Sequence, residues 1–263
     1  MKITVLAENT AKDSGLTAEH GLSLFVETDN HKILFDMGQT DAFVKNALSL
    51  GVDLTKADIA VLSHGHYDHG GGIKAFLKLN SIAPVYLNRE AFGRHFNGSE
   101  KYIGLDQDLK NNDRLVFVDE ELRINDEMLL LSCNGKEKCF ATEPFGLNIE
   151  INGVMQSERF HHEQYLLIEE NGKRVLFSGC SHKGILNIQQ WFQPDAFVGG
   201  FHLSKLDPAT ADCEKLKDTA DTLLKYKTKY YTAHCTGVAQ YEYLKTVMGE
   251  SIEYLSTGCC III

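Results

Sequence analysis

The clearest chemical feature of the chain is a run of four potential metal ligands within six positions: His64, His66, Asp68 and His69. Neutral imidazole and carboxylate are the usual nitrogen and oxygen donors to zinc and iron, so one loop can supply several ligands. Three glycines follow at positions 70–72, where they let the backbone turn sharply and lie close to bound ions. The segment therefore predicts a metal site.

Further residues that could take part in the chemistry, as metal ligands or as a proton donor, occur later in the chain. Each of four stands shortly after a short apolar run: Cys180, His182, His202 and His234. Such runs predict buried strands, and α/β folds place their binding sites at the ends of strands. A thiolate is a suitable ligand for zinc or iron, and the pKa of an unperturbed histidine suits proton transfer near neutral pH. We expect these side chains to gather where the strands end.

Hydrophobic periodicity predicts the elements that must position these residues. In the first part of the chain it indicates strands at 2–7, 22–27 and 32–36, followed by a helix at about 41–50. A buried strand at 59–62 and a second helix from 73 onward come next. In the last part the order of strand, polar loop and helix repeats. Its strands are expected at 165–169, 174–177, 196–198, 229–232 and near 261, with helices at 185–192, 207–224 and ending near 248.

Composition and charge limit the class of protein. A chain of 263 residues with 43% hydrophobic and 24% charged positions, four prolines and no internal repeat predicts a single domain, 1–263. Residues 86–160 interleave short strands with Gly, Asn and charged residues, so we expect a variable excursion there. A formal charge of -10 disfavours a nucleic-acid partner. No apolar run approaches a membrane span or a signal peptide, so we expect a cytoplasmic protein with reduced cysteines and no membrane partner.

The pattern His64-x-His66-x-Asp68-His69 resembles the signature of the metallo-β-lactamase-fold hydrolases. The resemblance implies an α/β fold, the αββα four-layer sandwich, with a two-metal site along one edge. It also implies that His64 and His66 bind the first ion, and that Asp68 and His69 bind the second.

The same resemblance indicates the later ligands by their positions. His234 takes the place of the last histidine, which completes the second site, and Cys180 takes the place of a shared aspartate or cysteine. Either His162 or His182 closes the first site, because His162 lies at the family's interval upstream of Cys180 and His182 stands two residues beyond it. A buried structural role is the alternative for Cys180, and a supporting or helix-capping role is the alternative for His182.

Three further motifs narrow the resemblance to one branch of this family: Gly179-Cys180-Ser181-His182, Gly199-Gly200-Phe201-His202-Leu203 and His234-Cys235-Thr236-Gly237. They are similar to the branch named for the synthase that joins a dihydropterin to ribofuranosyl-aminobenzene phosphate. Many bacterial members of that branch have no evident need for methanopterin, so the branch name does not define the substrate.

The resemblance implies two divalent transition-metal ions, zinc first, with iron or manganese as alternatives. We expect a metal-activated hydroxide to attack a small-molecule substrate, a phosphoester, ester or lactone. Asp68 would orient the hydroxide, and His202 would act as general acid or bind a substrate phosphate. A phosphate-handling pterin-type transferase and a metal-binding sensor with little turnover are the alternatives. A redox di-iron enzyme is disfavoured, because such members have Glu at the position of His66 and a flavin domain.

Residues outside these motifs receive lesser roles. Asp36 is expected to support a ligand histidine. Four residues of the excursion form a group that could meet a substrate phosphate or carboxylate, or simply a solvated face: Arg89, Arg94, His95 and Lys101. Three histidines without a motif are expected at the surface: His20, His31 and His161.

Overall fold

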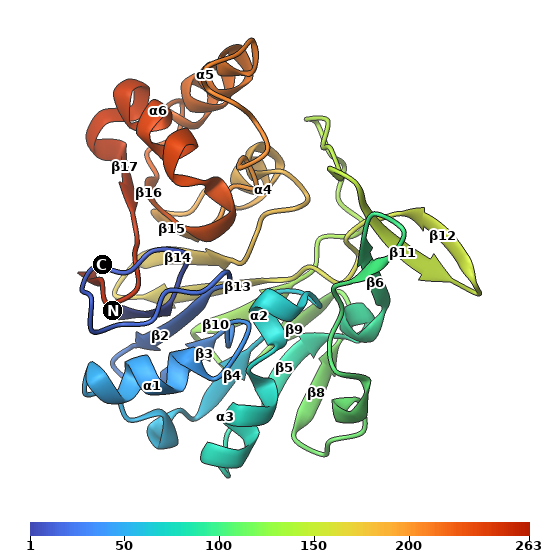
Figure 1. Ribbon diagram of the computed structural model, residues 1–263. Coiled ribbons are helices and arrows are strands. Elements are labelled where there is room, and N and C mark those ends of the chain that lie inside the picture. Colours follow the sequence, from blue (N-terminus) through green and yellow to red (C-terminus); the bar gives the residue numbers. More distant parts are fainter.

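Two seven-stranded sheets form the centre of the molecule in the computed structural model, which describes residues 1–263 (Figure 1). The first sheet has the strand order β18-β1-β2-β3-β4-β5-β8. Its strands, in chain order, are β1 (Lys2–Ala7), β2 (Ser23–Glu27), β3 (Lys32–Phe35), β4 (Ile59–Val61), β5 (Val85–Asn88), β8 (Leu115–Val118) and β18 (Cys260–Ile262).

The second sheet has the strand order β17-β16-β15-β14-β13-β10-β9. Its strands are β9 (Glu121–Arg123), β10 (Met128–Leu131), β13 (Tyr165–Glu170), β14 (Lys173–Ser178), β15 (Ala196–Gly199), β16 (Lys229–Thr232) and β17 (Ile252–Tyr254). Strands β14 to β17 run parallel to one another, so their carboxyl ends lie at the same edge.

The inner faces of the two sheets pack against each other in a shared core. Phe35 of β3 and Phe177 of β14 lie with their ring centroids 5.6 Å apart. Side chains alternate along each strand, so Ile33 and Phe35 enter this core while Leu34 points to the outer face. Every strand of this kind must therefore be covered on both sides.

Helices provide that outer cover and complete the expected αββα sandwich (Figure 1). Phe43 and Phe76 pack on the first sheet, and Leu216 and Leu244 pack on the second. The helices are α1 (Ala42–Ser49), α2 (Tyr67–Gly70), α3 (Ile73–Leu79), α4 (Ile185–Phe192), α5 (Asp212–Leu223) and α6 (Val238–Met248). Short 3-10 turns occur at Leu54–Lys56, Arg89–Phe92, Gln107–Leu109, His234–Thr236 and Gly249–Ser251. No helix combines the length and the apolar composition that crossing a membrane requires.

A third, smaller sheet projects from one side of the sandwich (Figure 1). Its strand order is β12-β11-β6-β7, with β6 (Arg94–Asn97), β7 (Lys101–Tyr102), β11 (Leu147–Ile151) and β12 (Val154–Ser157). Only part of the expected excursion at 86–160 is therefore separate from the two main sheets. Strands β8, β9 and β10 fall within those limits but join the two main sheets, because residues such as Val118, Met128 and Leu130 are buried in the central core.

The other predicted elements agree with the structure to within about two residues, except for the helix expected at 207–224. The helix α5 begins only at Asp212. The preceding residues form a turn in which the Asp207 carboxylate accepts the Ala209 N–H at 2.9 Å and the Asp207 carbonyl accepts the Thr210 hydroxyl at 2.9 Å. Side-chain hydrogen bonds of this kind compete with the first turn of a helix.

Candidate metal centre

The strands bring the predicted ligands to one edge of the sandwich. Strand β4 leads directly into the loop that holds residues 64–69. The loops after β14, β15 and β16 carry Cys180, His202 and His234, and they lie together because these strands are parallel neighbours. Residues that are far apart in the sequence therefore surround one small volume.

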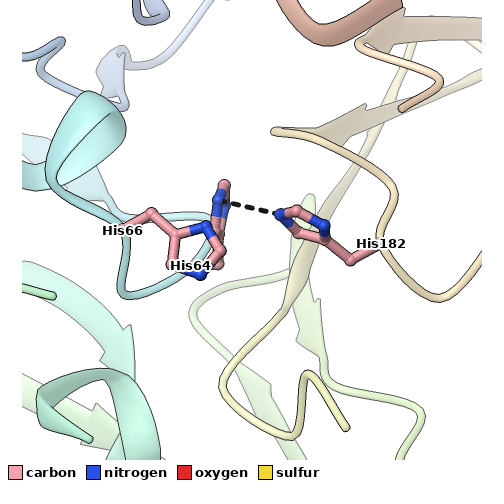
Figure 2. Close-up of side chains that lie close together, drawn as sticks. All are labelled: His64, His66 and His182. Atoms are coloured by element: carbon pink, nitrogen blue, oxygen red, sulfur yellow. Dashed lines mark hydrogen bonds between the residues drawn. The ribbon is translucent and has the colours of Figure 1, made fainter. Parts of the chain in front are cut away.

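His64, His66 and His182 form a first cluster, with one ring nitrogen of each within 4.8 Å of the others (Figure 2). All three side chains are buried. Nε2 of His64 lies 3.3 Å from Nε2 of His182, which reaches across from the second sheet (Figure 2). The ring of Phe160 stacks on His182 with a centroid distance of 4.3 Å and holds its orientation.

His69, Asp68, His234 and Cys180 form a second cluster beside the first. Nε2 of His69 is 3.2 Å from Nε2 of His234 and 3.2 Å from Sγ of Cys180. Oδ2 of Asp68 lies 3.2 Å from Nε2 of His234 and 3.8 Å from Nε2 of His69. The two clusters adjoin, because His64, His69 and Cys180 also present ligand atoms within 4.8 Å of one another.

A fully buried carboxylate beneath the loop orients one histidine of each cluster. Asp36 Oδ2 accepts a hydrogen bond from Nδ1 of His69 at 2.7 Å, as expected for a supporting residue. Asp36 also accepts the backbone N–H and the hydroxyl of Ser63, each at 2.7 Å. Since the hydroxyl has one proton, Ser63 Oγ accepts from Nδ1 of His64 at 2.8 Å. The network thus assigns the Nδ1–H tautomer to His64 and His69 and leaves both Nε2 lone pairs facing the centre.

A second network fixes His234. Asn9 Oδ1 accepts a hydrogen bond from Nδ1 of His234 at 2.7 Å, which again leaves the Nε2 lone pair free. The buried carboxylate of Glu8 accepts the backbone N–H of His234 and the hydroxyl of Tyr254, both at 2.7 Å. These contacts hold His234 at a positive φ of 50°, a conformation that non-glycine residues rarely adopt.

The protonation states of His64, His182 and Asp68 suit a divalent metal. At His69 burial is outweighed by the carboxylates of Asp36 and Asp68, which raise its pKa, so a metal would compete with a proton there. Burial and the neighbouring imidazoles lower the pKa of His64 and His182 well below the usual range, which favours the neutral, metal-binding form. Burial alone would raise the pKa of Asp68, but His69 and the other nearby histidines hold it well below its usual range. The Nε2 atoms of His69 and His234 both carry lone pairs, so they cannot hydrogen-bond to each other when neutral. A cation between the donors would satisfy all of them, so the residues present fit divalent ions.

Comparisons with known proteins agree with this architecture. The family model described as the Metallo-beta-lactamase superfamily matches residues 16–131. The crystal structure of Tm1679, described as a metal-dependent hydrolase of the beta-lactamase superfamily, is 29% identical, with a TM-score of 0.81 over 100% of this chain and 99% of that one. The uncharacterized protein MJ0448 of Methanocaldococcus jannaschii is 30% identical over 210 residues, 76% of this chain and 79% of that protein. This chain belongs to the metallo-beta-lactamase superfamily.

A named enzyme is also similar to this member of the metallo-beta-lactamase superfamily. The 7,8-dihydropterin-6-methyl-4-(beta-D-ribofuranosyl)-aminobenzene-5'-phosphate synthase of Methanocaldococcus jannaschii is 28% identical over 284 residues, covering 98% of this chain and 95% of that protein. The branch to which the sequence motifs point is thus represented among its relatives.

The structure separates the two histidines that sequence reasoning considered for the first cluster. His182 lies with His64 and His66, whereas His162 lies with His66 and His95. Nδ1 of His162 accepts the backbone N–H of Gly65 at 2.8 Å, so its proton is on Nε2. That nitrogen has no lone pair to offer a metal, and this arrangement favours His182 over His162 as the closing ligand.

His95, from the third sheet, lies with His162 and His66. The sequence did not indicate that this residue would be buried. His95 lies on β6, is fully buried, and has its ring centroid 4.0 Å from that of His162. Its Nδ1 donates to Oε2 of Glu158 at 2.7 Å. Nε2 of His95 and Nε2 of His66 are both buried without a hydrogen-bond partner. No local motif marks His95, because the pairing of β6 with β11 brings it to the metal centre.

The three cations near His95 in the sequence lie at the surface, which is the second of the two roles left open for this group. Arg89 pairs with Asp119 at 2.6 Å, and Arg94 pairs with Glu150 at 3.2 Å. Lys101 is exposed on β7. Arg89 and Arg94 thus pair with separate carboxylates, and Lys101 lies over the ring of Tyr67, so the three cations do not converge on one anion.

His20 lies beside the second cluster, which the sequence did not indicate. Its side chain is largely exposed, as predicted, but its Nε2 lies 3.3 Å from Oδ2 of Asp68 and its ring centroid lies 4.8 Å from that of His234. The connection between β1 and β2 carries it to the rim of the second cluster. The sequence around His20 has no motif that would have indicated this position.

His202 and two cysteines complete the surroundings. His202 has a positive φ of 56°, and its ring centroid lies 4.2 Å from that of His182. Neither of its ring nitrogens, both buried, has a hydrogen-bond partner. Its backbone N–H donates to Sγ of Cys235, which in turn donates to the carbonyl of Cys180 at 3.4 Å. Burial raises the pKa of the Cys180 thiol, so a bound cation would be needed to keep a thiolate there.

Proposed function

We propose that this protein is a metal-dependent hydrolase that uses two divalent transition-metal ions, zinc first, to cleave a small ester, lactone or phosphoester. The observation that carries the proposal is the pair of adjoining clusters, in which seven buried potential ligands direct their donor atoms toward one another over short distances. His64, His66 and His182 would hold one ion. Asp68, His69, Cys180 and His234 would hold the other.

Two bound ions would activate water and stabilise the negative charge that develops on the substrate. The protein's own groups would do the rest. The hydrogen bonds that Asp36 and Asn9 accept hold His69 and His234 in the tautomers that bind metal. Asp68 would orient the attacking water, and His202 would hold a proton for the leaving group on one of its free ring nitrogens.

A phosphate-handling transferase is the second candidate. The observation in its favour is the similarity to the dihydropterin synthase over 95% of that protein's length. The two candidates differ in the acceptor of the transferred group, which is water in a hydrolase and an organic molecule in a transferase.

Elemental analysis of protein prepared without chelator tests the proposal. We expect close to two transition-metal ions per chain, because the clusters offer more ligands than one four-coordinate ion can take. The double variant His64→Ala/His66→Ala should lose metal. The control His31→Ala should keep it, because His31 pairs with Asp58 at 3.0 Å and belongs to neither cluster. A content well below one ion, or full retention in the double variant, would refute the metal assignment.

Activity is tested with the metal-loaded protein on a panel of esters, lactones and phosphoesters. Turnover with water as the only acceptor supports the hydrolase. Turnover that appears only when an organic acceptor is added would replace it with the transferase. If the fully metal-loaded protein shows neither activity, both the hydrolase and the transferase candidates are contradicted.

A further inference from the structure

A cavity of about 350 Å³ opens beside His182 and His202. This volume lies near the small end of the range for ligand sites, about 300–1,000 Å³. Aromatic and aliphatic side chains form much of its lining, among them Phe140, Phe145 and Leu186. The ring of Phe145 lies 5.6 Å from that of His202, so a flat group could stack close to the proposed proton donor.

The outer wall of this cavity is held in place before any ligand binds. It is the segment 140–145, which the side chain of Asn187 on α4 fixes to the second sheet's helical layer. Asn187 accepts the N–H of Phe140 at 2.9 Å and donates to its carbonyl at 2.8 Å. At Gly184, where φ is +88°, a Cβ would come within 2.7 Å of the Thr142 methyl group, so the wall and the start of α4 fit closely.

The cavity has almost no charge with which to bind an anionic body. Its only Lys, Arg, Asp or Glu residues are Glu143 and Lys215, which are opposite in sign and exposed at the rim. Lys215 is already paired with Asp212 at 3.1 Å. A phosphate or carboxylate placed deep in this cavity would lose its hydration and find no Lys or Arg partner there, only hydrogen-bonding groups such as Ser181 and His202.

We infer that this cavity binds the alcohol part of a carboxylic ester, and that this part is a flat, uncharged aromatic group. The inference rests on the proposed function and narrows it to one substrate class. In the reaction the oxygen of water bonds to the acyl carbon, and the bond from that carbon to the alcohol oxygen breaks. Of the two protons of the water, one replaces the proton that His202 gives to the alcohol oxygen. The other leaves with the carboxylic acid.

Matched substrates test the inference in the metal-loaded protein. We compare 1-naphthylmethyl acetate, ethyl acetate and 1-naphthylmethyl phosphate. We expect kcat/KM to be at least about tenfold higher for the naphthylmethyl ester than for ethyl acetate, mainly through KM. Phe145→Ala should reduce that ratio by about tenfold, whereas Leu48→Ala, at an exposed residue on α1, should leave it unchanged. A ratio near one, or a preference for the phosphate of the same alcohol, would overturn the inference.

Binding of the product 1-naphthalenemethanol, followed by its fluorescence, separates the inference from the proposed function. Binding to the wild-type protein that Phe145→Ala abolishes supports the cavity assignment even if no ester is hydrolysed, and in that case only the hydrolase proposal fails. Hydrolysis of small esters without preference and without binding of the alcohol refutes the cavity assignment and leaves the hydrolase proposal standing. If the protein neither binds the alcohol nor hydrolyses any of the esters, the cavity assignment and the hydrolase proposal are both refuted.

Discussion

Asp36→Asn is the most informative single change at the proposed metal centre. Asp36 has no exposed surface, and its carboxylate accepts three hydrogen bonds of 2.7 Å from Ser63 and His69. Its φ is +57°, which Asn tolerates as well as Asp does, so the backbone should stay in place. The substitution keeps the size and shape of the side chain and replaces one acceptor oxygen with an NH₂ group.

That NH₂ group would face donors. If the amide nitrogen takes the position of Oδ2, it meets Nδ1–H of His69 and the Ser63 hydroxyl, and His69 is driven to the tautomer that carries its proton on Nε2. The lone pair would then point away from the metal. Loss of such a supporting partner costs about 10–100-fold in metal affinity. This corresponds to about 1.4–2.8 kcal/mol, close to the range of about 1.5–3 kcal/mol for a hydrogen bond to a charged group.

Competition with a chromophoric chelator at neutral pH measures that affinity. The matched control is Asp58→Asn, because Asp58 also pairs with a histidine, His31 at 3.0 Å, but in a partly exposed position outside the metal centre. We expect weaker metal binding in Asp36→Asn and no change in Asp58→Asn. Equal affinity in the wild-type protein and in a folded Asp36→Asn variant would refute the argument that Asp36 sets the tautomer of His69.

Three further predictions follow from the same geometry. His202→Ala should keep its metal but lose about 10²-fold or more in turnover of esters with poor leaving groups, while activated aryl esters remain good substrates; loss of metal would instead make His202 a ligand. Cys180 should resist alkylation in the metal-loaded protein and react after chelation, and Cys180→Ser should weaken metal retention; peptide mapping that finds equal labelling in both folded states, with unchanged metal in the serine variant, would remove Cys180 from the site. Glu158→Gln should lower the free energy of unfolding by about 1.5–3 kcal/mol in urea titrations, because a buried charged acceptor of the His95 hydrogen bond is lost. Glu150→Gln, at the pair with Arg94 near the surface, should cost about 1 kcal/mol or less, and equal costs would contradict this reasoning.

The sequence alone places residues of the candidate site together where potential ligands are neighbours in the chain. His64, His66, Asp68 and His69 lie in one loop, so their spacing alone brings them together. The strands that precede the later loops were also recognisable, because buried parallel strands are short apolar runs. Their polar ends could therefore be placed at one edge before the structure was known, and Asp36 could be assigned as a supporting residue.

Only the tertiary structure decided which distant side chains complete the site. His162 and His182 are both within reach in the sequence, and the hydrogen bond from Gly65 to Nδ1 of His162 separates their roles. His20 and His95 reach the centre through the β1–β2 connection and through the third sheet, and neither has a local motif. Hydrophobic periodicity encodes which face of an element is buried, but contacts between loops depend on strand order and register across the whole molecule. The ligand loop was therefore readable from the chain, whereas its surroundings followed from the packing of elements far apart in sequence.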